Sequence, residues 1–475
     1  MVNNLLLLCL FAAACVLLYH LLPKKKAVKL AALQLFSVVF YILCDWRAFF
    51  VLLCVTVYTY YAAIWISGRQ EQPKRKKMLA VGIIPPLCVL FVSKYIGVFD
   101  ALVTKIFGAD LLSDAGVSLI SFLGISYYTF KVVSYLVDVY RNKYACERNF
   151  LMVSVYITFF PQIVSGPIQR FDSFGDSFAD LGYKRDLFMS GLGEILLGLF
   201  MKSVIADRLS GYVSEVFENY ASVNGLALWL GAFFFTIQLY CDFAGYSYVA
   251  IGFTKLFGID CPKNFNAPFF SRSIKEFWNR WHISLSSWLR DYVYFPLGGS
   301  RCSKYRRFFN ILVTFLVSGL WHGAGLHYAV WGLLNGLLVY FYSKKFSESK
   351  NPFAVVFSTL LTFLATMLTL IVFRSSSLSA AFVYLKRMVT AFSLNMTAIQ
   401  SAVLPFTSDN TCIAFFLTAV FFILITAWHE FRTVYPPKRR SEKTAEVLSY
   451  VWYIFMLTSV ILFGQFGNDF IYGNF

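Results

Sequence analysis

Long apolar runs separated by short polar segments make up most of this chain. A membrane-spanning helix needs about 20 predominantly apolar residues, and runs near that length recur along the chain. By this hydropathy rule the pattern predicts about eleven or twelve spans. They lie at residues 4–22, 27–44, 48–67, 78–97, 117–139, 187–206, 226–243, 308–325, 328–343, 353–374, 411–430 and 447–466. The sequence therefore predicts an all-α polytopic membrane protein.

One apolar stretch, YITFFPQIVSGPIQRF at residues 156–171, is interrupted by Pro161, Gly166 and Pro167. Broken backbone at membrane depth is tolerated where it is buried in protein or lines a wet cavity. The interruption predicts a re-entrant segment in which residues 151–166 enter the membrane and return to the same side. A kinked interfacial helix fits the same residues equally well, and the pattern leaves both interpretations open.

A second unusual stretch is SIKEFWNRWHISLSSWLRDY at residues 273–292. At 100° per residue, eight large apolar residues share one face, which predicts a single amphipathic helix. A separate polar stripe holds Lys275, Asn279, His282, Ser286 and Arg290. Such a helix suits the membrane interface or the mouth of a funnel. Periodicity alone favours a peripheral anchoring helix with a solvated histidine.

Composition agrees with a membrane protein, since 58% of residues are hydrophobic and the mean hydropathy is +0.63. The net charge of +17 lies in loop clusters that fall on one side of the membrane if the N-terminus is outside. These clusters are at residues 24–26, 69–77, 141–148, 170–185, 255–307, 344–345 and 438–443, with isolated exceptions at Lys105, Arg208, Lys386 and Arg387. The charge therefore indicates topology and no nucleic-acid partner. Without a repeat or a soluble segment, residues 1–475 are predicted to form one integral domain.

Several kinds of site are excluded by the motifs. The ten cysteines form no C-x-x-C pair, and His322 and His327 lie five residues apart, about 140° around a helix, which is wrong for a zinc pair. We therefore expect no metal. The sequence has no G-x-S-x-G elbow, P-loop or dinucleotide fingerprint, so covalent serine and nucleotide-dependent mechanisms have no support.

Two ionisable residues inside apolar segments are candidates for function. His322 lies in GLWHGAG, about 14 residues or roughly 20 Å into its predicted span, and Asp242 lies in QLYCDFAGYSYVAIGF. A neutral imidazole can act as a general base, and the glycines beside His322 would let a substrate or another backbone approach. The alternatives are a histidine packed between helices and, for Asp242, a place at the cytoplasmic end of its span.

Long ordered motifs resemble the membrane-bound O-acyltransferase family, in its bacterial branch with the alginate O-acetyltransferase and the D-alanyl transfer protein of teichoic acids. They are KNFNAPFFSRSIKEFWNRWHISLSSWLRDYVYFPLGGSR, LVSGLWHGAGLHYAVWGLLNG, FFPQIVSGPIQRF and QLYCDFAGYSYVAIG. The resemblance covers most of residues 117–340, whereas residues 353–475 match in general character. It implies a central tunnel, with His322 as the active-site histidine and His282 as the second active-site polar residue. Further residues within the motifs are candidates for lining the tunnel: Asp242, Tyr246, Trp278, Arg280, Arg290, Asp291 and Trp321.

The resemblance also implies an activity. We expect an acyl group, most simply acetyl, to pass from a cytosolic thioester to an extracellular or cell-wall polysaccharide. Acetyl-CoA would be the donor, no cofactor would be bound, and an exported SGNH-hydrolase-like partner would complete the transfer. The protein would be surrounded by lipid in a bacterial plasma membrane. D-alanyl transfer from a carrier protein is the nearest alternative; a transporter and a noncatalytic assembly scaffold are alternatives from other classes.

Overall fold

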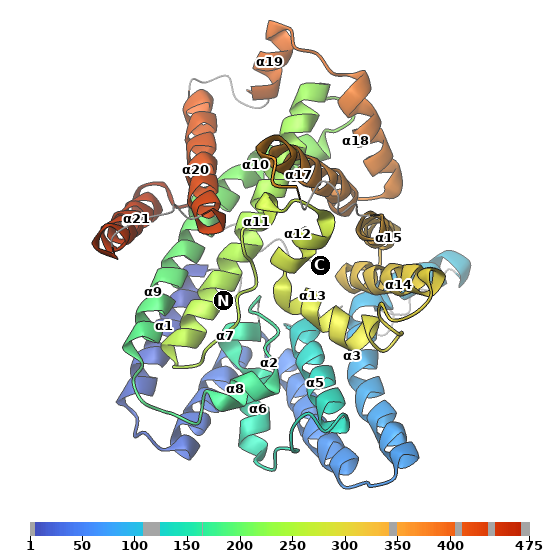
Figure 1. The fold of residues 1–475 in the computed structure, drawn as a ribbon, viewed down its shortest axis with the longest axis vertical. Helices are drawn as coiled ribbons and strands as arrows, with labels where there is room; N and C mark the ends of the chain where they lie inside the picture. Colours follow the sequence, from blue (N-terminus) through green and yellow to red (C-terminus); the bar gives the residue numbers. More distant parts are fainter. Residues whose placement is uncertain are drawn as a thin grey trace. The chain divides into compact units, whose positions relative to one another are not determined.

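The computed structural model describes residues 5–107, 124–163, 165–341, 349–403, 411–435 and 442–466. Within these ranges the chain is mostly helical and has no β-strand (Figure 1). Seven of the described helices are long and apolar enough to cross a membrane, and three apolar helices are shorter. The predicted all-α polytopic class is therefore confirmed. The chain forms two compact units, Met1–Ile195 with Ser247–Lys263, and Leu196–Tyr246 with Asn264–Phe475. The assignment of residues 1–475 to one domain stays a prediction.

The first unit contains most of the N-terminal helices. They are α1 (Leu5–Leu21), α2 (Lys26–Ser67), α3 (Gln72–Phe107), α5 (Ile125–Tyr140), α6 (Phe150–Thr158), α7 (Phe160–Ile163) and α8 (Phe171–Asp176), together with part of α9 (Arg185–Leu199) and of α11 (Gly225–Leu256). The predicted spans 27–44 and 48–67 are the two halves of α2. Asp45 has non-helical dihedral angles between them, and its carboxylate accepts a hydrogen bond from the Arg47 amide at 2.9 Å. Residues 117–123 of another predicted span lie outside the described residues.

The interrupted stretch breaks where the proline predicts. α6 ends at Thr158, Phe159 is non-helical, and α7 begins at Phe160 immediately before Pro161. Proline lacks an amide hydrogen and its ring clashes with the preceding turn, so the helix cannot run through this point. Phe159 and its neighbours are buried against α2 in the first unit. This burial agrees with broken backbone enclosed by protein.

The second unit contains the remaining helices and two π-helical turns. They are η1 (Phe200–Ala206), α10 (Asp207–Glu218), η2 (Pro268–Phe270), α12 (Ile274–Arg280), α13 (Ile283–Leu289), η3 (Arg290–Tyr294), α14 (Lys304–His322), α15 (Leu326–Tyr340), α17 (Pro352–Arg374), α18 (Leu378–Thr390), α19 (Met396–Val403), α20 (Thr411–Val434) and α21 (Glu442–Phe463). The helices α18 and α19 follow α17 and were not among the predicted spans. α14 remains helical up to His322, so the last three residues of predicted span 308–325 are outside the helix.

The prediction of one amphipathic helix over residues 273–292 was wrong. Two short helices, α12 and α13, replace it, because His282 adopts a left-handed conformation with φ 42° and ψ 54°. Backbone hydrogen bonds to another segment stabilise the break between the two helices. The Asn266 amide donates to the Arg280 carbonyl at 3.0 Å, and the Ile283 amide donates to the Asn264 carbonyl at 2.9 Å. The polar stripe is therefore divided between two helices.

A close approach of backbones joins α9 to α11 within the first unit. A methyl group added at Gly252 would lie 2.5 Å from the Gly191 carbonyl oxygen and 2.5 Å from the Ile195 side chain. Both distances are shorter than van der Waals contact. The two helices can pack at this separation only because residue 252 has no side chain.

We predict that Gly252→Ala destabilises the protein by about 1–3 kcal/mol, since the added methyl forces the helices apart. Gly211→Ala is the matched control, because nothing lies within 4 Å of a methyl group at this position in α10. It should be neutral or should gain about 0.5–1 kcal/mol from the better helix propensity of alanine. Thermal unfolding in detergent measures both variants. Equal melting temperatures would contradict the packing argument.

Candidate active site

His282 stands at the break between α12 and α13, buried to 2% exposure. A left-handed conformation is strained for a residue with a side chain, and it persists only where surrounding contacts over-determine it. Those contacts come from the loop before η2, which pairs its backbone with the residues on both sides of His282. The imidazole is therefore held in the interior of the second unit, and the expected solvated histidine of a peripheral helix was wrong.

Asn264 determines which nitrogen of the neutral His282 ring carries the hydrogen. Its side-chain oxygen Oδ1 accepts hydrogen bonds from the Ser284 amide at 3.2 Å and from the Ser284 hydroxyl at 2.9 Å. A backbone amide can only donate, so the Asn264 atom must be the carbonyl oxygen. His282 Nδ1 lies 3.1 Å from that oxygen. Nδ1 therefore carries the hydrogen and donates it, and in the neutral ring Nε2 keeps its lone pair.

The other ring nitrogen, His282 Nε2, is the atom that would accept a proton. His282 Nε2 has no hydrogen-bond partner among the described residues, although it is fully buried. Burial lowers the pKa of His282 to about 3, because the charged imidazolium is disfavoured away from water. The ring therefore stays neutral across the physiological pH range. A neutral, oriented imidazole has the protonation state of a general base, but the burial that lowers its pKa also makes it a weak base, so proton transfer to Nε2 requires a group that stabilises the imidazolium.

His322 and His282 both lie near the indole of Trp321. The Trp321 ring centroid is 4.6 Å from that of His322 and 6.3 Å from that of His282. The Phe243 ring meets His282 edge-on at 4.7 Å. His322 is 4% exposed, and the rings of Trp331 and Phe373 both lie 5.1 Å from it. The structure thus brings both predicted histidines into one aromatic cluster in the second unit.

Trp278 belongs to the same cluster. Its ring lies 5.9 Å from Trp331, which contacts His322. The indole Nε1 atoms of Trp278 and Trp331 have no hydrogen-bond partner among the described residues, although both atoms are buried. A buried indole N–H normally finds an acceptor. These two donors and His282 Nε2 are thus three buried polar atoms without a partner among the described residues.

The glycines around His322 serve helix packing. A methyl group added at Gly319 would lie 2.3 Å from the Tyr328 carbonyl oxygen, so α14 and α15 approach each other there with backbone against backbone. The predicted approach of another backbone is therefore seen at Gly319, whereas Gly323 lies against the Tyr328 ring and Gly325 against the His327 ring. Close packing of α15 holds the end of α14, and hence the His322 ring, in a fixed position.

Asp242 lies in the middle of α11 and is fully buried, so the helix continues beyond it; its place relative to the cytoplasmic end of the membrane span stays a prediction. Its carboxylate pairs with Lys202 Nζ at 2.7 Å, and Asp207 pairs with the same nitrogen at 2.6 Å. The Tyr246 ring centroid is 5.5 Å from Lys202 Nζ. Lys202 is on the π-helical turn η1, a geometry that often marks functional positions. Asp242 and Tyr246 thus form an ionic cluster around Lys202.

The three charged candidates in residues 280–291 are engaged in ion pairs. Arg280 binds Glu276 one turn earlier at 2.9 Å and donates to the Asn266 carbonyl at 3.2 Å. Arg290 pairs with its neighbour Asp291 at 3.0 Å, and the Arg290 side chain is 57% exposed. These contacts indicate a structural role for the three residues as ion pairs. Lining of a tunnel by these three residues stays a prediction.

Sequence reasoning missed two residues of these sites. Lys202 interrupts an apolar run, and an ionisable residue inside a span is a signal for function. Asn264 carried no such signal, because its role depends on contacts made 18 and 20 residues away. Among the described residues, no group of three His, Cys, Asp or Glu side chains could hold a metal ion.

Fold and site together define the class: an all-α, multi-pass membrane protein with a buried pair of histidines near one tryptophan. The chain belongs to the membrane-bound O-acyltransferase family, whose model matches residues 2–343. Among named relatives, it is 34% identical to the probable alginate O-acetylase AlgI of Pseudomonas syringae pv. tomato over 71% of this chain. It is 35% identical to the peptidoglycan O-acetyltransferase of Helicobacter pylori over 51% of this chain, and 34% identical to the teichoic acid D-alanyltransferase of Bacillus subtilis over 40%. The chain spans 65%, 47% and 50% of the length of these three relatives.

We predict that Asn264→Leu removes the preference of the neutral His282 ring for carrying its hydrogen on Nδ1. Imidazole nitrogen chemical shifts of the purified protein distinguish a protonated from an unprotonated nitrogen, and His282→Gln assigns the His282 signals by difference. The native protein should show a protonated Nδ1 and an unprotonated Nε2 between pH 5 and 8. Asn264→Asp should raise the pKa of His282, since a carboxylate stabilises the imidazolium. A native Nε2 that carries the proton would contradict the assignment.

Lys202→Met should destabilise the protein by about 3–5 kcal/mol, because it leaves two buried carboxylates without their cation. Lys74→Met is the matched control. Lys74 binds Glu71 at 2.9 Å, but the two side chains are 61% and 65% exposed, and such a pair contributes about 0–1 kcal/mol. Denaturant unfolding in detergent compares the two variants. Similar losses of stability in the two variants would show that burial of the ion pair does not determine how much its removal destabilises the protein.

Proposed function

We propose that this protein transfers an acyl group, most simply acetyl, from a cytosolic thioester for O-acetylation of an extracellular or cell-wall polysaccharide. The family match and the similarity to two O-acetyl-transferring relatives support this activity. Within the chain, the observation that carries the proposal is the open Nε2 of His282 in the same aromatic cluster as His322.

The proposed chemistry moves one proton and exchanges one bond. His322 takes the proton of the acceptor hydroxyl as the oxygen bonds to the carbonyl carbon of the thioester. The carbon–sulfur bond breaks, and the thiolate leaves as a thiol after taking up the proton. His282 shares this proton or positions the donor, with Nε2 as its acceptor atom. General base catalysis of this kind is worth about 10²- to 10⁴-fold in rate.

The remaining assignments extend the same proposal. Acetyl-CoA is the proposed donor and is a substrate, with no bound cofactor required. An exported SGNH-hydrolase-like partner would complete transfer to the polysaccharide. The protein would lie in a bacterial plasma membrane with its N-terminus outside, because this orientation places the main basic clusters in the cytoplasm.

D-alanyl transfer to teichoic acid is the second candidate function. The teichoic acid D-alanyltransferase of Bacillus subtilis shares 34% identity with this chain, so the same histidines could serve either acyl group. Its match covers 40% of this chain, against 71% for the probable alginate O-acetylase. The wider match favours acetyl transfer.

We predict that His322→Ala and His282→Ala each reduce surface acetyl ester by about 10²-fold or more at equal protein level, because each removes a proposed proton acceptor. Ester released by mild alkali from surface polymers measures the effect in cells that carry each variant. His327→Ala is the matched control, since the His327 ring contacts Tyr328 at 4.1 Å and His327 is not a proposed proton acceptor. It should keep wild-type ester.

The same experiment separates the alternatives. Released D-alanine in place of acetate would favour D-alanyl transfer. Ester that persists in both His282→Ala and His322→Ala would contradict catalysis by these residues and would favour an assembly scaffold. A transporter would retain part of its substrate flux in His322→Ala.

A further inference from the structure

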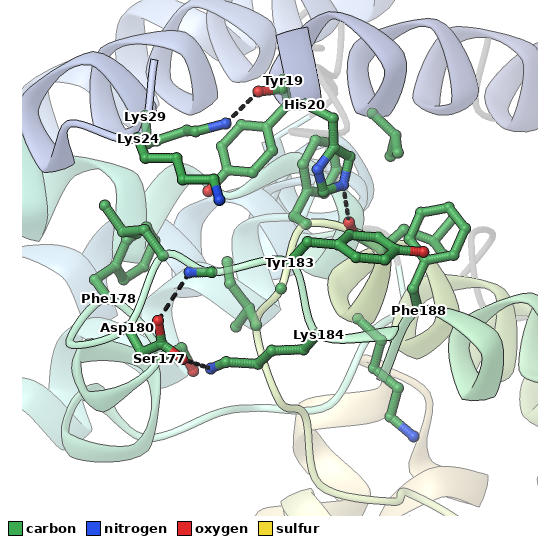
Figure 2. A pocket seen from close by; sticks show the side chains of 18 of the residues that line it. Tyr19, His20, Lys24, Lys29, Ser177, Phe178, Asp180, Tyr183, Lys184 and Phe188 are labelled. Atoms are coloured by element: carbon green, nitrogen blue, oxygen red, sulfur yellow. Dashed lines mark hydrogen bonds and ion pairs between the residues drawn. The ribbon is translucent and has the colours of Figure 1, made fainter. Parts of the chain in front are cut away.

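A cavity of about 620 Å³ lies entirely within the first unit (Figure 2). This volume is typical of sites that bind a small molecule. The cavity is bounded by the ends of α1 and α11, the start of α2, the loop before α9 and the first turns of α9. It contains neither of the proposed catalytic histidines. Its contents are therefore a question separate from the transfer reaction.

One side of the cavity is apolar. Ala13, Val16 and Leu17 lie on one face of α1, and Phe188 and Leu192 lie one turn apart on α9. Most of the lining surface is contributed by apolar atoms. Such walls fit a hydrocarbon chain, whereas a fully polar ligand would leave them without a partner.

Cations line the cavity as well, beside the end of α1 and on the loop before α9. Lys24 and Lys29 project toward the cavity from the start of α2 and the residues before it, beside the ring of Tyr19 (Figure 2). Lys184 pairs weakly with Asp180 at 4.0 Å, and Lys255 is neutralised by Glu194 at 2.7 Å. Lys24 and Lys29 form no ion pair with any carboxylate among the described residues.

Lys29 is the decisive residue, because it is buried to 4% exposure without an anion. Its ammonium group donates to the Tyr19 carbonyl and lies 4.0 Å from the centroid of the Tyr19 ring. These contacts satisfy part of the hydrogen-bonding capacity of the ammonium group, which lines the cavity together with a second cation, Lys24. An anion in the cavity would be attracted by both lysines.

We propose that this cavity binds a phosphate-bearing amphiphile, an acidic phospholipid, with its phosphate at Lys24 and Lys29 and an acyl chain along α1 and α9. The proposed topology puts the Lys24–Lys26 cluster on the cytoplasmic side, where acidic lipids concentrate and basic pockets between helices bind their headgroups. Free phosphate or a coenzyme A phosphate would offer the same charge, but neither would fill the apolar wall in the same way.

Native mass spectrometry of the full chain in detergent tests the proposal with added phosphatidylglycerol. We expect one phosphatidylglycerol to be retained at least tenfold more strongly than phosphatidylcholine. Lys24→Glu should reduce this retention at least tenfold, and Lys29→Gln should do the same. Lys24 is exposed, so its variant is expected to fold, and Lys76→Glu at an exposed position of α3 is the matched control that should bind normally.

Two further arms distinguish the source of the phosphate. Inorganic phosphate or acetyl-CoA at millimolar concentration should not displace the bound phosphatidylglycerol. Displacement by acetyl-CoA would assign the cavity to the acyl donor and would overturn the lipid proposal. Equal retention of phosphatidylglycerol by the native chain, Lys24→Glu and Lys29→Gln would also overturn it. These measurements use no acyl transfer, so their outcome is independent of the proposed function.

Discussion

The hydrogen bonds of Asn264 hold the centre of the second unit. At the break between α12 and α13, a buried backbone turns through a left-handed residue, and every polar group exposed by that turn needs a partner. The Asn264 carbonyl and side-chain oxygen together accept from Ile283, Ser284 and His282. The same group of hydrogen bonds that satisfies the broken backbone also determines which nitrogen of His282 carries the hydrogen. Local folding and proton chemistry therefore depend on one amide side chain.

The first unit supports its own break in a similar way. Lys131 on α5 donates to Gln162 Oε1 at 2.8 Å and to the Tyr156 carbonyl at 3.0 Å, next to the interruption at Phe159. Gln162 donates in turn to Gln169 at 2.6 Å, and Gln169 to the Asp260 carbonyl at 2.7 Å. A chain of amide bonds thus joins the broken segment to the residues after α11. In both units, long polar side chains replace the helical hydrogen bonds that a break removes.

Features set by local composition could be predicted from the sequence, and features set by distant partners could not. Apolar runs located the spans, and Pro161 located a break because proline removes a helical hydrogen bond, although Pro85 and Pro86 lie inside α3 without ending it. His282 follows no proline or glycine, and its neighbours keep helical periodicity, so the break there had no local sign. The motifs placed His322 and His282 in one site, which the Trp321 contacts support. The partner of Asp242 was missed because Lys202 lies 40 residues away.

The buried lysines show how the same ammonium group takes different roles according to its surroundings. Lys202 is matched by two carboxylates, which fixes it as part of an ionic cluster. Lys131 is enclosed by protein and bonded to two neutral oxygens, which suits a structural cross-link. Lys29 has one carbonyl and the face of a ring, and it borders open volume. Among the described residues, Lys131 and Lys29 both lack a carboxylate partner, but Lys131 is enclosed by protein whereas Lys29 lines a cavity. That difference makes Lys29, and not Lys131, the candidate for binding an anion from outside the chain.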